Sequence, residues 1–448
     1  MNDQALKQTL LNLPNREPEA IVDQIFIPDF LNALGFDLME RVPQYSTGRG
    51  NDAVDYALRH NTQDDIFLQT KANPSVLVEL KGKDVNLAEG SSQYKSTVKQ
   101  IRRYLLSPNC KSVQWGIITN SSHIQLFRKH SKVIYPATQC LEITTDNVNE
   151  NVQKIANNIK NTPRALTVAV YNNKGGVGKT TTTVNLASVL AIKGKKVLVV
   201  DFDPNQQDLT NSLGIKPGKV TFYSCLADKK NQVPFEDVVR PYKIHFKKLN
   251  KDFIFDVIPA NEEFSNMGED DLRQNLKRFR LRQFLGSLKS QYDYILIDSP
   301  PNWRFFSISA IYAADVVFIP TKHNNIFSLE NAAVAISKYI SDVQEKRKDG
   351  GPIALPIFFN GEKITDAARN TANKAIQDII QKAKKEHKFD LLPYFYPRYT
   401  SSKKDLHIFD VPSYAHIADA AFSRIPATYK NKTARDYYLS LAKEYFLQ

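Results

Sequence analysis

Residues 172–186 read NNKGGVGKTTTTVNL, and this stretch decides the fold of the second half of the chain. It follows an apolar run typical of a buried strand and precedes a segment with helical spacing. Glycines at such a turn let successive backbone N–H groups point at phosphate oxygens, where the helix N-terminus favours negative charge. The residues of this turn are Gly175, Gly176, Val177 and Gly178. The stretch therefore predicts a phosphate-binding loop, or P-loop.

Three residues after the glycines extend this prediction to a nucleotide and a metal ion. Lys179 has the position from which a P-loop lysine reaches the β- and γ-phosphates, and the Thr180 hydroxyl has that of a Mg²⁺ ligand. We expect Thr181 to complete the contacts to the nucleotide. Asn173 replaces the usual first glycine of the GxxxxGK[ST] pattern. A glycine-rich turn without a ligand is the alternative, but the strand-loop-helix context argues against it.

The segments that follow Pro163 predict a layered α/β domain. Apolar strands alternate with helical segments, and the strands read LTVAVYNN, KVLVVDF, FIFDVIPA, YDYILID, DVVFIPT and PIFFN. Near-continuous apolar strands separated by helices indicate a mainly parallel sheet that is covered by helices on both faces.

The same half of the chain resembles the ParA/MinD family of ATPases. KGGVGKTT, with Lys174 directly after Asn173, resembles the deviant Walker A loop of that family. DFDPNQQDLTNSLG resembles its DxDPQG(N/D)LT switch segment, and YDYILIDSPP resembles its Walker B strand. AADVVFIPT at 313–321, the strand that ends at Asn360 and the closing IPATYKNKTARDYYLSLAKEY extend the resemblance, which covers 164–448 almost throughout.

This resemblance implies an ATPase that uses Mg²⁺ and forms a homodimer around two ATP molecules. Lys174 would reach the nucleotide of the partner, and Asp203 would orient the attacking water. Asp201 and Asp298 would hold Mg²⁺ and its waters, and Asn360 would contact adenine. The structural alternatives are strand-end aspartates that cap turns and an ordinary loop asparagine.

The chain departs from the family pattern in the switch segment. Between Pro204 and Leu209 it reads NQQD, one residue longer than the pattern and without its glycine. We expect this change to affect switch geometry and hydrolysis rather than ATP binding. Family members also bind DNA through basic surface, and lysines gather here at 381–389 and 398–405. A solvated helix face explains the first cluster equally well.

In the first half of the chain, VLVELKGK at 76–83 places two charged residues in an apolar strand. Glu79 and Lys81 would share one face of that strand, as at a solvated edge or in a metal site. Asp55, on the less apolar side of the preceding strand NDAVDYAL, completes a D…ExK pattern. Two carboxylates in such a pattern can hold Mg²⁺ against a scissile phosphate, while the lysine orients water or stabilises the developing charge.

The next helix adds Gln100 and Tyr104 at the edge of its apolar stripe. Their spacing in QIRRY resembles the QxxxY motif that follows D…ExK in one branch of the PD-(D/E)XK nucleases. Over about 15–140, the order of elements resembles the N-terminal nuclease domain of type I restriction R subunits. This resemblance implies a Mg²⁺-dependent DNA endonuclease with Glu19 as a further metal ligand. A degenerate domain that only binds DNA or the ATPase is the alternative.

We therefore expect a nuclease-like domain of the restriction-endonuclease α/β type at 1–145, a polar linker at 146–163 and a P-loop ATPase domain at 164–448. Lys+Arg 60 against Asp+Glu 47 gives a net charge of +13, which favours a polyanionic partner such as DNA. The three cysteines form no CxxC pair, which argues against a disulfide framework or a zinc knuckle. Without a leader sequence or an apolar run that could span a bilayer, the sequence predicts a cytoplasmic protein with no membrane partner.

Three functional hypotheses follow. The favoured one is an ATP-regulated DNA-processing enzyme in a defence or mobile-element setting, in which dimerisation pairs two nuclease sites. The second is a DNA partition or positioning ATPase whose N-terminal domain is a non-cleaving adaptor for DNA or for an unidentified protein partner. The third is a regulator of transcription, although no helix-turn-helix pattern supports it.

Overall fold

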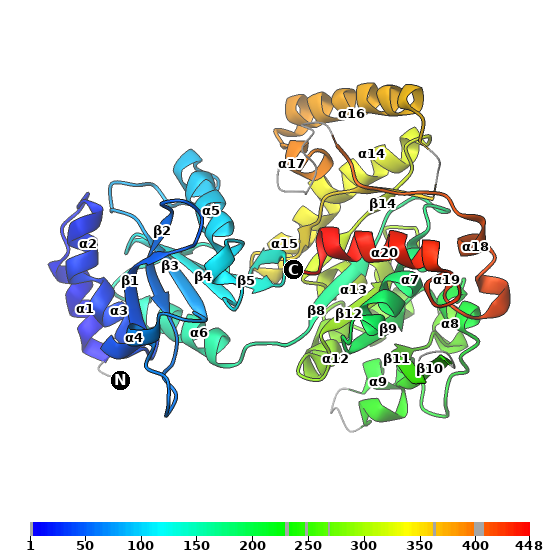
Figure 1. The fold of residues 1–448 in the computed structure, drawn as a ribbon, viewed down its shortest axis with the longest axis horizontal. Helices are drawn as coiled ribbons and strands as arrows, with labels where there is room; N and C mark the ends of the chain where they lie inside the picture. The colour runs from blue at the N-terminus through cyan, green and yellow to red at the C-terminus, as the bar shows by residue number, and fades with distance from the viewer. Residues whose placement is uncertain (1–2, 229–232, 247–249, 268, 362–363, 398–406) are drawn as a thin grey trace. The chain divides into compact units, whose positions relative to one another are not determined.

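The computed structural model describes residues 3–228, 233–246, 250–267, 269–361, 364–397 and 407–448. The chain divides into two units that are each built around their own sheet (Figure 1). We call Met1–Thr162, with Lys348–Gly351 and Gln448, the N-terminal unit. The C-terminal unit comprises Pro163–Arg347 and Pro352–Leu447.

The N-terminal unit contains a mixed sheet of seven strands in the order β1-β2-β3-β4-β5-β6, with β7 paired to β5. Only β3 and β4 are parallel neighbours, because helix α5 connects them as a crossover. The strands are β1 (Arg41–Ser46), β2 (Ala53–Leu58), β3 (Val76–Leu80), β4 (Trp115–Thr119), β5 (His123–His130), β6 (Val133–Pro136) and β7 (Leu141–Glu142). The helices are α1 (Asp3–Asn12), α2 (Glu19–Ile25), α3 (Ile27–Ala33), α4 (Phe67–Thr70), α5 (Ser92–Leu105) and α6 (Val148–Lys160), with short 3-10 turns η1 (Leu38–Glu40) and η2 (Pro108–Cys110).

Strand β3 is buried on both faces. Val76, Val78 and Leu80 pack into a core with α1, α2, α3 and α6, whereas Leu77 packs into a second core with α5. Alternation along a strand places Glu79 on the same face as Leu77. Its charged side chain is therefore inside the protein rather than at a solvated edge.

The segment 146–163 differs from the polar linker that the sequence predicts. It forms α6, and Val148, Val152 and Ile155 of this helix are buried in the first core of the N-terminal unit. These residues recur at helical spacing, so one face of α6 is apolar although its other positions are mostly polar. The helix therefore belongs to the packed N-terminal unit.

The C-terminal unit contains the expected mainly parallel sheet. Its order is β10-β11-β9-β12-β8-β13-β15, and only the β10–β11 pair is antiparallel. The strands are β8 (Leu166–Val170), β9 (Val197–Asp201), β10 (Arg240–Phe246), β11 (Lys251–Ile258), β12 (Tyr294–Asp298), β13 (Val316–Phe318) and β15 (Ile353–Ala354). A smaller parallel sheet joins β14 (Pro320–Thr321), β16 (Phe358–Asn360) and β17 (Asp410–Val411).

Helices cover both faces of this sheet, because every residue of β8, β9 and β12 is buried. The first helices are α7 (Lys179–Ile192), α8 (Asp208–Leu213), α9 (Phe222–Ala227), α10 (Glu262–Ser265), α11 (Glu269–Asn275), α12 (Arg280–Leu288) and α13 (Phe305–Ala313). They are followed by α14 (Ile326–Val334), α15 (Ile340–Arg347), α16 (Asp366–His387), α17 (Leu392–Phe395), α18 (Ala415–Ala418), α19 (Ala427–Lys430) and α20 (Lys432–Tyr445). Short turns are η3 (Phe235–Asp237), η4 (Ala335–Tyr339) and η5 (Ala421–Ser423). The C-terminal α19 and α20 pack against α7, the helix of the P-loop (Figure 1).

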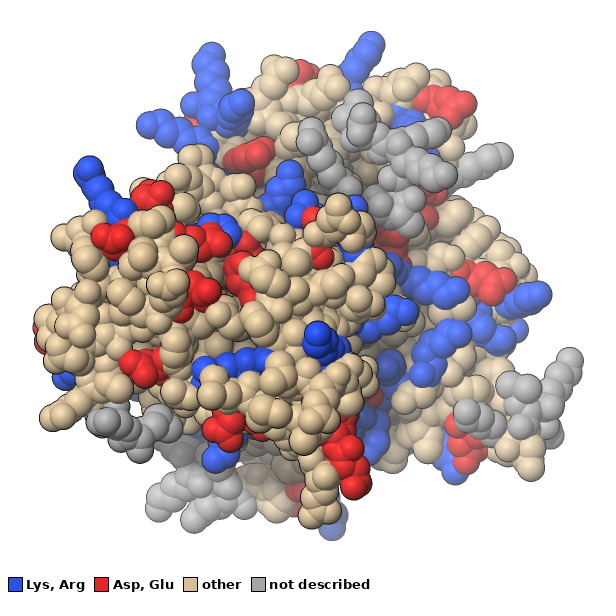
Figure 2. All heavy atoms as spheres, turned by 60° about the vertical axis from the view of Figure 1, so that its left-hand side comes forward, with Lys and Arg blue, Asp and Glu red and all other residues tan. Residues whose placement is uncertain are grey.

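The charged surface is mixed. On the face that Figure 2 shows, the described lysine and arginine side chains are interspersed with acidic and other residues and do not form a single basic surface. In α16, Lys382, Lys384 and Lys385 are exposed, whereas the second predicted lysine cluster, 398–405, lies outside the described residues. A search of the described ranges finds no helix that is both long and apolar enough to cross a membrane.

Candidate functional site

The P-loop connects the end of β8 to the start of α7, as the sequence predicts. Gly176 and Gly178 have φ of 74° and 84°, a conformation that is strained for residues with a Cβ. The buried Lys179 folds back over the loop, and its Nζ donates to the carbonyl of Lys174 at 3.4 Å. Burial lowers the pKa of Lys179, an effect that the carboxylates of Asp298 and Asp203 oppose. The lysine is thus held where its charge is desolvated and free to meet phosphate.

The first turn of α7 contacts the end of β12. Thr180 Oγ1 donates to Asp298 Oδ2 at 2.6 Å, and Asp298 is only 2% exposed. Asp298 Oδ1 is buried without a hydrogen-bond partner among the described residues. Burial, with repulsion from Asp201, raises the pKa of Asp298 to about 8. A cation beside Thr180 and Asp298 would relieve this desolvation, so the residues present fit Mg²⁺.

Asp201 anchors the switch segment. Its Oδ2 accepts hydrogen bonds from Thr210 Oγ1 at 2.6 Å and from the Thr210 backbone N–H at 2.9 Å. The Thr210 hydroxyl also accepts from the N–H of Ala260 at 2.9 Å, so it links β9, α8 and the segment after β11. Burial raises the pKa of Asp201 to about 6. Sequence reasoning did not single out Thr210, although it occupies the threonine position of the switch pattern.

The NQQD segment forms a turn that is capped by Asp203. The N–H of Gln206 donates to Asp203 Oδ1 at 3.3 Å, and the N–H of Gln207 donates to the Asp203 carbonyl at 2.9 Å. Gln207 has a φ of 49°, in the left-handed region that favours glycine, and precedes the first residue of α8. The longer segment therefore keeps the left-handed position that a glycine would favour, and in this structure it engages Asp203.

Asn360 holds the P-loop in place. Its side-chain Nδ2 donates to the carbonyl of Val177 at 2.9 Å and to Thr182 Oγ1 at 3.3 Å. The contact is close, because a Cβ on Gly178 would lie 2.3 Å from this nitrogen. The amide that the sequence assigns to adenine thus faces the backbone of the P-loop. Lys174 lies in the same loop, and its N–H donates to Asn172 Oδ1 at 3.0 Å.

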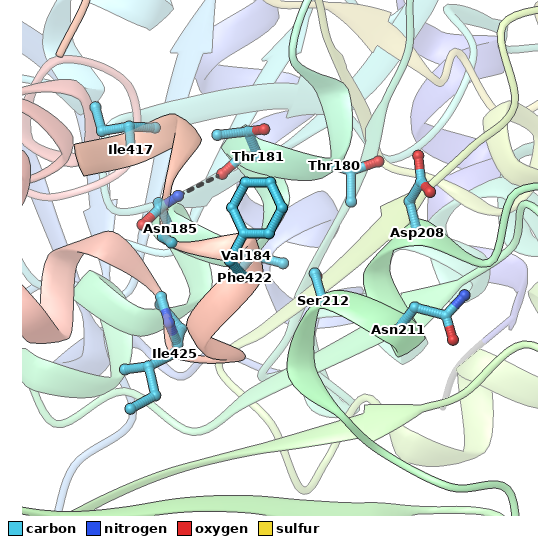
Figure 3. Close-up of a pocket in the computed structure, with 12 residues that line it drawn as sticks. Thr180, Thr181, Val184, Asn185, Asp208, Asn211, Ser212, Ile417, Phe422 and Ile425 are labelled. Atoms are coloured by element: carbon cyan, nitrogen blue, oxygen red, sulfur yellow. Dashed lines mark hydrogen bonds between the residues drawn. The ribbon is translucent and has the colours of Figure 1, made fainter. Parts of the chain in front are cut away.

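A cavity of about 430 Å³ adjoins the P-loop helix (Figure 3). It is enclosed by the first two turns of α7, by α8 and by the segment 417–426. The lining residues are Thr180, Thr181, Val184, Asn185, Asp208, Asn211, Ser212, Ile417, Ala420, Phe422, Ile425 and Pro426. Because three distant segments build it, no sequence pattern pointed to this cavity.

The parallel sheet, the glycine loop and the Thr180–Asp298 contact define a P-loop nucleotide-binding unit. A family model described as "AAA domain" matches residues 165–350. The sporulation initiation inhibitor protein Soj of Bacillus subtilis is 33% identical over 217 residues, which are 47% of this chain and 78% of Soj. The chromosome partitioning protein ParA of Myxococcus xanthus is 36% identical over 155 residues, 34% of this chain and 50% of that protein. The chain belongs to the ParA/Soj family of P-loop ATPases.

Among the first curated relatives, the chain spans between half and about three-quarters of their length, with 50% of the Myxococcus protein, 78% of Soj and 62% of Soj from Treponema pallidum. The structure of a Cyanothece McdA variant in complex with ATP is similar with a TM-score of 0.46 and 21% identity, covering 64% of this chain and 98% of that one. MinD of Pyrococcus horikoshii complexed with Mg-ADP gives a TM-score of 0.41 and 22% identity, covering 61% and 93%. Consistent with such complexes, ATP and Mg²⁺ are the cofactors of this fold.

In the N-terminal unit, the D…ExK residues come together around Lys81. Its Nζ donates to Glu79 Oε1 at 2.6 Å and to the carbonyl of Leu80 at 2.7 Å, and lies 3.6 Å from Glu19 Oε2. Glu79 is 2% exposed, and its Oε2 has no hydrogen-bond partner among the described residues. Burial and the nearby Asp55 raise the pKa of Glu79 to about 7. The lysine is the cation that balances these carboxylates.

Asp55 is bound to the same strand end. Its Oδ2 accepts from the N–H of Leu80 at 2.7 Å, and its Oδ1 accepts from Gln44 Nε2 at 3.3 Å. Burial raises the pKa of Asp55, while Leu80 N–H and Lys81 oppose the shift. Gln44 has a φ of 45°, which marks a local distortion of β1 opposite Asp55. Sequence reasoning missed Gln44, because nothing in the pattern of β1 indicates the distortion.

The QxxxY residues form a pair on α5. Gln100 Nε2 donates to the Tyr104 hydroxyl at 3.0 Å, as two residues one helical turn apart can do. Across the part of the chain that the structure describes, no group of three or more His, Cys, Asp or Glu side chains is arranged to hold a metal ion. For the N-terminal cluster, the position of Lys81 among the carboxylates accounts for this. A metal ion would have to replace the lysine there.

Proposed function

We infer that this protein is a partition or positioning ATPase that binds and hydrolyses ATP with Mg²⁺ and forms a homodimer when ATP is bound. The N-terminal unit acts as its adaptor for DNA or for a partner protein. The observation that carries the ATPase assignment is the buried Thr180–Asp298 contact beside the P-loop. The comparisons support this function better than the DNA-processing nuclease, since the relatives include chromosome partitioning proteins.

The residues divide the chemistry as follows. Lys179 and the P-loop N–H groups bind the phosphates, and Lys174 contacts the nucleotide of the second subunit. Thr180, Asp298 and Asp201 hold Mg²⁺ and its waters, and the ion neutralises charge on the transferred phosphate. Asp203 positions the attacking water once its bond to the N–H of Gln206 has opened. The chain thus contributes mainly positioning and charge, as phosphoryl transfer requires.

A direct experiment measures ATP binding and hydrolysis by the full chain. The parent should bind ATP–Mg²⁺ and hydrolyse it, Asp203→Ala should bind it without hydrolysis, and Lys179→Ala should lose binding. Failure of the parent to bind ATP would reject the assignment. DNA binding is tested in the same preparation by replacing Lys382, Lys384 and Lys385 together with glutamine, which should weaken binding and reduce its salt dependence.

A second candidate function is Mg²⁺-dependent DNA cleavage by the N-terminal unit. It is favoured by the convergence of Asp55, Glu79, Lys81 and Glu19, with one carboxylate oxygen of Glu79 buried and without a partner among the described residues. Asp55 and Glu79 would bind the ion with Glu19, and Gln100 and Tyr104 would support the site from α5. A defence or mobile-element role belongs to this candidate alone.

Cleavage of plasmid and single-stranded DNA separates the two candidates. The parent and Glu79→Gln proteins are compared with Mg²⁺, each with and without ATP. Cleavage by the parent that Glu79→Gln abolishes would establish the nuclease, and its dependence on ATP would show whether dimerisation gates it. No cleavage under any condition leaves the N-terminal unit as an adaptor.

A further inference from the structure

Phe422 is the most exposed large apolar side chain among the described residues, at 92%. It belongs to η5, and its ring stands at the cavity between Thr181 and Val184 in Figure 3. An isolated exposed side chain needs no explanation, but an aromatic ring at the mouth of a cavity beside a P-loop has a ligand of matching chemistry close by.

The cavity begins where a bound nucleotide would leave the P-loop. Thr180 and Thr181 form one end of it, and both lie in the first turn of α7, at the phosphate-binding end. From the α-phosphate, the nucleoside therefore extends along α7 toward Val184. On another face of the same turn, the side chain of Asn360 is already engaged by Val177 and Thr182.

The cavity has the chemistry of a base subsite. Val184, Ile425 and Pro426 supply apolar surface for the faces of a planar ring. Asn185 is occupied, because its Nδ2 donates to the carbonyl of Thr181 and its Oδ1 accepts from the N–H of Thr428. The exposed Asn211 is the lining amide that remains for a ribose hydroxyl or a base edge. Apolar walls with few polar groups are typical of small-molecule sites.

We propose that this cavity is the subsite for the base of the nucleotide and that Phe422 stacks on that base as a specificity-determining residue. The inference rests on the proposed ATP binding, which it extends to the nucleoside half. Base–aromatic stacking depends on the ring face and tolerates different bases. Since η5 packs against α8, a bound base would also order the helix that follows the switch segment.

The test compares the binding of ATP with that of inorganic tripolyphosphate, which has the phosphates but no base. Both dissociation constants are measured by calorimetry with Mg²⁺ for the full-length parent, Phe422→Ala and Phe422→Trp. Phe422→Ala should weaken ATP about tenfold, the change that loss of one base stack corresponds to, and should leave tripolyphosphate unchanged. Phe422→Trp should retain ATP affinity, and its indole fluorescence should change when ATP binds.

Phe327→Ala is the matched control, because Phe327 is also exposed, at 62%, but lies on α14 away from the cavity lining. It should leave both affinities unchanged. Phe422→Ala that binds ATP within twofold of the parent, or that weakens tripolyphosphate to the same extent, would overturn the base subsite. A parent that binds neither ligand would instead reject the proposed ATPase itself.

Discussion

Thr180 Oγ1 lies 2.6 Å from Asp298 Oδ2, so a single hydrogen bond joins the first turn of the P-loop helix to the end of β12. These residues are 118 positions apart in the chain. The other oxygen of Asp298 is buried without a partner among the described residues. A buried carboxylate with one hydrogen bond is unfavourable in its charged form unless a cation is nearby. The contact therefore makes the ATP site depend on a bound cation.

Replacing Asp298 with asparagine should change stability and activity in opposite directions. Without nucleotide and Mg²⁺, Asp298→Asn removes a buried charge and should raise the free energy of unfolding by about 1–2 kcal/mol. With ATP and Mg²⁺, hydrolysis should fall by at least about a hundredfold, because the ion loses a supporting group. Thermal melts and ATPase rates on one preparation measure both. A lower melting temperature without ligand would contradict the desolvation argument.

Replacing Gln207 with glycine should stabilise the protein. Gln207 has a φ of 49°, where glycine is less strained, so Gln207→Gly should raise the free energy of unfolding by roughly 0.5–1 kcal/mol. Gln206→Gly is the matched control, since glycine at a residue of ordinary conformation adds entropy to the unfolded chain and should be neutral or destabilising. Urea denaturation gives both values. Equal effects of the two substitutions would show that the left-handed turn is not strained.

Replacing Lys81 with methionine should strengthen the binding of a divalent cation by the N-terminal unit. The Lys81 ammonium contacts Glu79, Glu19 and the carbonyl of Leu80, where an ion with oxygen ligands would bind. Removing it should lower the dissociation constant for Mn²⁺ by about tenfold or more, as measured by paramagnetic resonance in the Asp298→Asn background.

Lys83→Met serves as the control for this measurement. Lys83 Nζ donates to the carbonyl of Leu13 at 3.2 Å, so its loss should not change Mn²⁺ binding. If Lys81→Met binds Mn²⁺ no better than the parent, the acidic cluster is a structural ion pair, and the nuclease candidate loses its main support.

The pH dependence of stability should reveal the buried Lys129. Its Nζ donates to the carbonyl of Cys110 at 2.7 Å, and burial lowers its pKa from 10.5 to about 8. The folded protein therefore releases this proton more readily than the unfolded chain, so the stability penalty is full below about pH 8 and disappears as the pH rises to 10.5. Between about pH 8 and 10, Lys129→Met should lose a rise on the order of 2 kcal/mol relative to the parent. Parallel unfolding curves of the two proteins would contradict this.

The sequence predicts the P-loop and the parallel sheet well, because glycine positions and apolar strand runs report local requirements of the backbone. It does not show which way a side chain faces, so the contact of Asn360 with Val177 was not foreseen. The cavity of Phe422 joins segments near 181, 211 and 422, and in sequence this phenylalanine is indistinguishable from a core residue. Such features depend on tertiary packing rather than on pattern.

The segment 146–163 gives a different lesson. Its asparagine-rich composition favoured a linker, yet Val148, Val152 and Ile155 recur at helical spacing and are buried. Here spacing was more informative than composition, because three apolar residues on one face suffice to pack a helix. For the D…ExK residues, the pattern predicted which side chains share a face of β3 but not that Lys81 would lie among the carboxylates.

The central claim is that ATP binding at the P-loop assembles a homodimer, and sedimentation of the hydrolysis-deficient Asp203→Ala protein tests it most directly. With saturating ATP and Mg²⁺, this variant should sediment as a dimer, and without nucleotide as a monomer. Adding Lys174→Ala should prevent dimer formation. A protein that binds ATP and remains monomeric at micromolar concentration would contradict the account.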